Sequence, residues 1–256
     1  MQFYGTERIY NDGWRKVPLP SPGSGIAGVD LGINNLFAAY GITADGRHVS
    51  VLFNGRPLKS IWYYWKRKIA KYQSMLNKHG PKTSRRLRLM NRKAKMQMKN
   101  YIDHQIRGLF RWLRMQGIGA VVVGLPHDIA HSNGNEYTVR IWMYGYVVRR
   151  LRELSEEESI AIHFVSEEYS SITDPFSGVV CKRCRRRRGL FYSPSIKKLL
   201  NADLVGAFNI LKRFLHNPES PAWGIGVTGR RPAQGQNKKD VAPNLPALAT
   251  PRTLAL

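Results

Sequence analysis

The segment at residues 25–40 constrains the fold more than any other part of the chain. Residues 26–31 have the apolar composition of a short buried strand, 34–35 that of a turn, and 36–40 that of the returning strand. Asp30 is the one charged residue in this run. A carboxylate on a central strand costs free energy to bury unless a positive group meets it. Asp30 is therefore either a hydrogen-bonded structural residue or a metal ligand held on rigid backbone.

The charge balance points to a polyanionic partner. The chain has 256 residues, 43% of them hydrophobic, so a substantial core can form. Its 41 Lys and Arg against 17 Asp and Glu give a net charge of +24. Lysine and arginine bind phosphates with release of counterions, so nucleic acid is the first candidate. A structural RNA-binding protein would be equally basic, and charge alone does not separate the two classes.

Membrane insertion and an oxidised scaffold are both disfavoured by the sequence. No apolar run approaches the ~20 residues that a membrane helix needs, and the first residues show no signal-peptide pattern. The two cysteines, Cys181 and Cys184, are too few for a disulfide framework. We therefore expect a cytoplasmic protein.

The order of the expected elements predicts an α/β fold of the RNase H-like (RuvC) class. Three strands form an antiparallel meander, with Asp45-Gly46 as a hairpin turn between the second and third. A helical arm, a strand, a helix, a strand and a last helix follow, which gives a mixed sheet with helices packed on it. In chain order, the expected strands are 26–31, 36–43, 47–53, 119–124 and 160–166, and the helices after the arm are 136–158 and 201–215.

Two basic helices are expected to form a hairpin arm over residues 57–117. Apolar residues recur at helical spacing through 59–78, and Thr83 or Ser84 can cap a second helix that runs to about Gln116. One interpretation is a solvated helical face. We favour a surface for nucleic acid, because almost no acid offsets the basic residues that begin the second helix: Arg85, Arg86, Arg88, Arg92, Lys93 and Lys95.

Three acids fall at the ends of expected elements: Asp30 on the first strand, Glu167 after the fifth strand, and Asp203 at the start of the last helix. Two Mg²⁺ ions ~3.5–4 Å apart can stabilise both oxygens of a phosphodiester displacement, and Mg²⁺ prefers oxygen ligands. An aspartate at a helix N-terminus is also favoured by the helix dipole. Each acid alone has a structural explanation, but together, in this strand order, they predict a catalytic metal site.

Several motifs resemble the TnpB family, also called OrfB, of transposon-encoded RuvC-like nucleases related to type V CRISPR effectors. The resemblance covers residues 25 to about 214 and includes the basic hairpin. It implies an RNA-guided DNA endonuclease that is encoded by an insertion sequence and assisted by Mg²⁺. The motifs that carry it are Gly-Val-Asp-Leu-Gly-Ile (28–33), Val-Val-Val-Gly-Leu (121–125), Glu-Glu-Tyr-Ser-Ser (167–171) and Asn-Ala-Asp-Leu-Val-Gly-Ala-Phe-Asn-Ile-Leu (201–211).

Gly124 departs from that family's usual pattern. Members often carry the second catalytic Glu at the end of the fourth strand, where this chain has Gly124. The resemblance then assigns the role to Glu167, with Glu168 as the alternative, because neighbouring side chains cannot both point at the metals.

The cysteines are a second departure. The family has a zinc ribbon with two Cys-x-x-Cys pairs, but this chain has the single pair Cys181 and Cys184, with Asp174 and Ser193 at cysteine positions. A closed zinc site needs four N or S ligands, so two ordinary thiols are favoured over a zinc site at Cys181 and Cys184.

The resemblance also suggests how the chain divides. Residues 1–24 are expected to be a linker or the remnant of an upstream domain, 25–214 the nuclease domain with a degenerate zinc-ribbon-like insert at 172–198, and 215–256 a disordered tail. Full-length relatives have guide- and target-reading domains before the first strand. The chain is then a fragment, a truncated copy or a minimal derivative, and a separate polypeptide could supply target recognition.

The sequence thus predicts a TnpB-type DNA endonuclease in which Asp30, Glu167 and Asp203 hold two Mg²⁺. Guide RNA and DNA are the expected partners, and their phosphates are expected to contact the arm and a second basic run, Lys182, Arg183, Arg185, Arg186, Arg187 and Arg188. One alternative is a catalytically decayed or repurposed relative that binds guide RNA or DNA without cleaving it. A dimeric RuvC-like junction resolvase is a weaker one.

Overall fold

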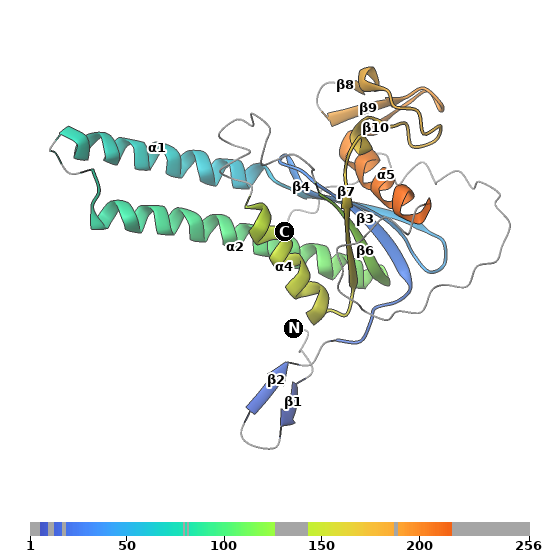
Figure 1. Cartoon of the computed structure of the whole chain (residues 1–256), viewed down its shortest axis with the longest axis horizontal. Helices are drawn as coiled ribbons and strands as arrows, with labels where there is room; N and C mark the ends of the chain where they lie inside the picture. Colours follow the sequence, from blue (N-terminus) through green and yellow to red (C-terminus); the bar gives the residue numbers. More distant parts are fainter. Residues whose placement is uncertain are drawn as a thin grey trace.

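A mixed sheet with helices on both faces forms the body of the protein, and a long helical hairpin projects from it (Figure 1). The computed structural model describes residues 19–216 except 79, 81, 126–142 and 187–188, together with the backbone of Thr6–Ile9 and Gly13–Lys16. Among the residues described, no helix is long and apolar enough to cross a membrane.

The central sheet has the strand order β5-β4-β3-β6-β7. The first three strands are antiparallel, whereas β6 pairs parallel with both β3 and β7. This order and these directions confirm the RNase H-like fold. The strands are β3 (Gly25–Leu31), β4 (Asn35–Ile42), β5 (His48–Asn54), β6 (Ile118–Leu125) and β7 (Ala161–Ser166).

Alternating side chains on these strands build two separate cores. On β6, Val121 and Val123 join the core under α2 (Arg85–Met115) and α4 (Tyr144–Glu157), whereas Val122 joins the core under α5 (Ala202–His216). Figure 1 shows α2 and α4 on one side of the sheet and α5 on the other. On β3, Ala27, Val29 and Leu31 belong to the first core, so Gly28 and Asp30 face α5.

The arm consists of α1 (Arg56–Lys78) and α2, as the helical periodicity predicted. Ser84 caps α2, because its hydroxyl accepts the Leu87 N–H at 3.1 Å. Most of the buried residues of α2 lie in its second half, against the sheet. The first half of α2 instead packs along α1, where Trp65 Nε1 donates to Gln97 Oε1 at 2.6 Å.

The segment expected to be loop-rich after residue 171 contains a second, small sheet. Its strands are β8 (Arg185–Arg186), β9 (Leu190–Ser193) and β10 (Lys198–Asn201), and two 3-10 turns, η1 (Ser170–Ile172) and η2 (Lys182–Cys184), precede them. We call residues 172–201 the small lobe. It packs on the α5 side of the sheet through Phe191, Leu200 and Cys184. These strands are too short to show periodicity in the sequence.

The amino-terminal end of the chain differs from the prediction, and the carboxyl-terminal end lies outside the described residues. The expected linker contains an antiparallel pair of strands, β1 (Thr6–Ile9) and β2 (Gly13–Lys16). The expected tail beyond residue 216 and the first part of the helix expected at 136–158 lie outside the described residues.

Candidate active site

The carboxyl ends of the parallel strands meet at one edge of the sheet, and Asp30 lies there. Val29 pairs with Val123, and Gly124 pairs with Val165. Asp30 and the residues that follow β7 therefore lie at the same edge. Ligands of open α/β sheets bind outside the carboxyl ends of the strands, so this edge is the natural place for a site.

Helix α5 passes directly over Asp30. A Cβ atom built on Gly206 would lie 2.6 Å from Asp30 Oδ2, so only a residue without a side chain fits at this position. One turn earlier on α5 lies Asp203. The first strand and the last helix, far apart in the sequence, therefore place two carboxyl groups on the same face of the sheet.

Asp203 is fixed by two asparagines. Asn201 precedes α5, and its Oδ1 accepts the N–H groups of Asp203 at 3.0 Å and Leu204 at 3.1 Å, which is an N-cap. Asn35, at the start of β4, donates from Nδ2 to Asp203 Oδ2 at 2.7 Å. Asp203 is thus held between the first hairpin of the sheet and the start of α5.

Glu167 comes directly after β7, and its N–H donates to Leu125 O at 3.1 Å. The turn that carries it is gripped by α5. Asn209 donates from Nδ2 to Ser170 O at 2.7 Å and to Thr173 O at 2.8 Å, and Arg213 donates to Ser166 O at 3.1 Å. The same helix that carries Asp203 therefore also positions Glu167.

Gly124 leaves room for this arrangement. A Cβ atom there would lie 2.4 Å from Ile210 Cδ1 and 3.2 Å from Glu167 Cβ. The space beside the end of β6 is thus already filled by Ile210 of α5 and by Glu167. Glu168, the alternative acid, is exposed, and it is absent from the charges that act on Asp30.

The three carboxyl groups act on one another electrostatically. Burial raises the pKa of Asp30 well above its ordinary value of 3.8, and the charges of Glu167 and Asp203 raise it further. Burial also raises the pKa of Glu167 from 4.5 to about 7. Glu167 and Asp203 are therefore near enough to Asp30 for their charges to act on it.

Arg185 is the one basic residue of the second run that reaches this cluster among the residues described. Its Nη2 lies 3.8 Å from Asp203 Oδ1, and its charge lowers the pKa of both Asp30 and Glu167. The sequence predicted that Arg185 contacts nucleic acid but not that it lies beside the acids. The position of Arg185 depends on the pairing of β8 with β9, and these strands lie in a segment whose sequence shows no periodicity.

Two further residues at the site were missed by the sequence analysis. Asn35 was expected to be part of a turn. Its amide side chain, next to the first hairpin, could have indicated a residue that hydrogen-bonds at the site. Tyr144 begins α4, and burial together with the charges of Glu167 and Asp30 raises its pKa, which places it beside the cluster. No motif in the sequence pointed to Tyr144.

Divalent cations fit the cluster chemically. Its donors are hard carboxylate oxygens, and Glu167 Oε2 is buried without a hydrogen-bond partner in the described part of the chain. An unsatisfied buried carboxylate oxygen is costly unless a cation meets it. Within the residues described, however, no three His, Cys, Asp or Glu side chains already have a metal-binding arrangement. Mg²⁺ takes few protein ligands and completes its shell with water and phosphate oxygens. The three carboxylates could therefore bind the ion together with the phosphate oxygens of a bound substrate.

The expectation of two free thiols was wrong. Cys181 and Cys184 form a disulfide bond across η2, with a Cα–Cα distance of 5.3 Å. A spacing of three residues suits both a metal knuckle and a local disulfide, so the sequence did not distinguish them. One short-range bond of this kind is not a disulfide framework.

The other residues expected to bind nucleic acid are spread over exposed surface. The six basic residues that begin α2 are all exposed on the outer half of the arm, and so are Lys182, Arg183 and Arg186 of the small lobe. Arg187 and Arg188 lie outside the described residues. These side chains surround no pocket, which suits contact with an extended phosphate backbone.

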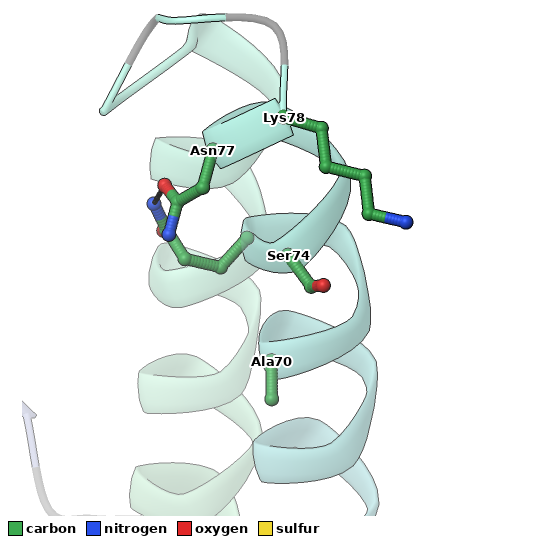
Figure 2. Close-up of a pocket in the computed structure, with 5 residues that line it drawn as sticks. Ala70, Ser74, Asn77 and Lys78 are labelled. Carbon is green, nitrogen blue, oxygen red and sulfur yellow. Dashed lines mark hydrogen bonds between the residues drawn. The ribbon is translucent and has the colours of Figure 1, made fainter.

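An open hollow near the tip of the arm is not this site. Figure 2 shows it against the last turns of α1, where Ala70, Gln73, Ser74, Asn77 and Lys78 line it. Gln73 donates to Asn77 Oδ1 at 3.1 Å and to Lys82 O at 2.9 Å. The hollow contains no acid and lies at the far end of the hairpin from the sheet (Figure 1), so we assign no chemistry to it.

The raised pKa of Glu167 predicts how stability depends on pH. Protonated Glu167 stabilises the fold below pH 4.5, and this contribution is lost as the pH rises to about 7, because the unfolded chain ionises first. The loss is at most ~3 kcal/mol. As the pH rises through this range, the unfolding temperature of the wild type should therefore fall relative to that of Glu167→Gln. At neutral pH, Mg²⁺ should raise the unfolding temperature of the wild type and so reduce this difference. Parallel curves with and without Mg²⁺ would contradict this assignment.

Comparisons with known proteins agree with this fold. Residues 14–130 match the family OrfB_IS605, described as "Probable transposase". The TnpB-like protein ORF457 of Acidianus two-tailed virus is 25% identical over 199 residues, which are 75% of this chain and 42% of that protein. A Cas12f1–sgRNA–target DNA complex matches with a TM-score of 0.57 and 16% identity over 77% of this chain and 51% of that one. A CRISPR-Cas12f ternary complex matches with a TM-score of 0.59 and 16% identity over 82% and 42%.

The order and directions of the strands, together with the likeness to the Cas12f chains, define an RNase H-like fold. The sequence matches are to the OrfB_IS605 family model and to a TnpB-like protein, which is the family that the motifs resemble. The chain spans about half the length, or less, of the relatives it matches.

Proposed function

We propose that this chain is the nuclease part of a TnpB-type, RNA-guided DNA endonuclease. The observation that carries the proposal is the convergence of Asp30, Glu167 and Asp203 on the α5 face of the sheet, around a buried Glu167 oxygen without a hydrogen-bond partner. Carboxyl groups that repel one another either keep a proton or take a cation between them, and a bound divalent cation would let all three ionise. The ion pair of Arg185 with Asp203, at 3.8 Å, does not by itself account for three acids at this place.

The residues have distinct tasks in this proposal. Asp30, Glu167 and Asp203 would hold two Mg²⁺, which supply an activated water and stabilise the leaving oxygen of a phosphodiester. Asn35 keeps the Asp203 carboxylate oriented through the 2.7 Å hydrogen bond. Arg185 is half-exposed beside Asp203, where its guanidinium can bind a phosphate oxygen of the strand to be cut.

The basic surfaces would hold the nucleic acid without reading its sequence. The arm presents exposed Arg and Lys side chains beside the exposed aromatic rings of Tyr63 and Tyr64. Lys68 Nζ lies 5.2 Å from the Tyr64 ring, so cations and rings already alternate on α1. Phosphates favour the cations, and unpaired bases stack on rings. Guidance by RNA rests on the likeness to the chain of the Cas12f1–sgRNA–target DNA complex.

A nuclease assay tests this proposal. The purified chain, with and without its co-purified RNA, is incubated with single-stranded DNA in Mg²⁺ or in a metal chelator, and the products are resolved on a gel. We expect cleavage in Mg²⁺ and intact DNA in the chelator. Tight binding without cleavage under every condition would favour the alternative, a nucleic-acid-binding protein that has lost its nuclease activity.

A further inference from the structure

The small lobe raises the question of what holds it together. Few of its side chains are buried, among them Phe191, Leu200 and Cys184. A unit with so small a core ordinarily needs disulfides or a structural metal. The family resemblance implies a zinc ion at this place.

Zinc does not fit the residues that are present. Both sulfur atoms of the lobe are bonded to each other in the Cys181–Cys184 disulfide, whereas a zinc ligand is a free thiolate. Two cysteine positions of the family are occupied by Asp174 and Ser193. Among the described residues of the lobe, no three His, Cys, Asp or Glu side chains are grouped as zinc ligands would be.

Asp174 lies between two segments of the lobe, the turn that follows η1 and the end of β9. Asp174 is 1% exposed, and it forms no ion pair with a basic side chain among the described residues. Four donors surround it instead. Oδ1 accepts the N–H groups of Phe176 at 2.9 Å and Ser177 at 3.3 Å, and Oδ2 accepts the Ser193 hydroxyl at 2.8 Å and the Ser195 N–H at 3.5 Å.

These bonds join two segments about 20 residues apart in the sequence. One is the turn that follows η1, and the other is the end of β9. A metal ion in a ribbon does the same, because it ties two turns to one central charge. Burial alone would raise the pKa of Asp174, but the four donors hold it below its usual range, so the centre keeps its negative charge.

We propose that the buried Asp174 carboxylate replaces zinc as the structural centre of the small lobe, so that the lobe folds without metal. Bonds to a charged acceptor are stronger than neutral ones, and here they come from both halves of the lobe. The lobe is thus a metal-independent version of a zinc ribbon. This part of the inference does not depend on nuclease activity.

The Asp174 carboxylate also positions Arg185, and this second part of the inference rests on the proposed function. Ser193 ends β9, and β9 pairs with β8 through Arg185 and Phe191. The hydrogen bonds of Asp174 therefore fix the strand beside which Arg185 reaches toward Asp203. Asp174 touches no substrate in this scheme, so it is a positioning residue.

Metal content and thermal unfolding of the full chain test the inference first. We expect no stoichiometric zinc in the purified protein, oxidised or reduced, and the same unfolding temperature with a zinc-selective chelator as without it. Stoichiometric zinc, or a chelator that lowers the unfolding temperature, would overturn the proposal.

Substitutions then test the carboxylate itself, with zinc added and withheld. Asp174→Asn should lower the unfolding temperature by about 4–8 °C and speed hydrogen exchange of β9 amides, and zinc should not restore either. Ser193→Ala removes one donor and should show about half of this effect. Ser195→Ala is the matched control, because Ser195 donates through its backbone N–H. Equal stability of Asp174→Asn and Ser195→Ala would refute the role of Asp174.

An activity measurement separates this inference from the proposed function. If the chain cleaves DNA, Ser193→Ala should slow cleavage without weakening DNA binding, because Arg185 is less well fixed. If the wild-type chain does not cleave at all, the nuclease proposal fails while the zinc and stability results still decide the role of Asp174.

Discussion

Asp30→Asn is expected to abolish Mg²⁺-dependent cleavage, by ~10³-fold or more, while leaving DNA binding intact. Asp30 is the acid on which the other two converge, since both Glu167 and Asp203 raise its pKa. An amide keeps the size of the side chain but cannot hold a divalent cation as a carboxylate does. Cleavage is followed on a labelled DNA strand, and binding by a gel mobility shift.

A loss of fold would not explain such a result. Replacing Asp30 removes repulsion within a cluster of acids, so the metal-free variant should be as stable as the wild type, or more stable. Asp45→Asn is the matched control, because Asp45 is an exposed acid in the turn between β4 and β5 and hydrogen-bonds locally with Arg47. Cleavage by Asp30→Asn at the rate of Asp45→Asn would remove the basis for the metal site.

The sequence allowed the sheet, the arm and the three acids to be predicted, because each depends on patterns that periodicity exposes. Apolar runs bounded by turns gave the strands, and the helical spacing of Trp65 and its neighbours gave the arm. Acids at the ends of such elements come together once the strand order is known. The prediction that Asp30, Glu167 and Asp203 share one edge of the sheet follows from this strand order.

The small lobe could not be predicted in the same way, and the physical reason is its lack of a periodic core. Strands of two to four residues do not reveal which face is buried. The position of Arg185 follows from that sheet and not from its own neighbourhood in the sequence. The spacing of Cys181 and Cys184 fits a thiolate pair and a disulfide equally well. Asp174 was noticed as a missing cysteine, but its four hydrogen bonds are visible only in three dimensions.

Gly28→Ala is expected to destabilise the fold by about 3 kcal/mol and to slow cleavage by about a hundredfold. A Cβ atom at Gly28 would lie 2.2 Å from Ala207 O, 2.8 Å from Leu211 Cβ and 2.9 Å from Leu211 N. Two of these three atoms belong to the backbone of α5, so the helix itself must move away from β3. Because α5 carries Asp203 and grips the turn of Glu167, its displacement separates the acids. Urea unfolding gives the loss of stability, and the cleavage rate of the folded variant gives the loss of activity.

Gly124→Ala is the informative comparison for stability, because it also adds a methyl group under α5. That methyl would meet the Cδ1 and Cγ1 atoms of Ile210 at 2.4 and 3.1 Å. A side-chain tip can rotate away at small cost, whereas a helix backbone cannot. Gly28→Ala should therefore lose clearly more stability than Gly124→Ala. Similar urea midpoints for the two variants would mean that α5 yields easily, and that its backbone is not what holds the carboxyl groups together.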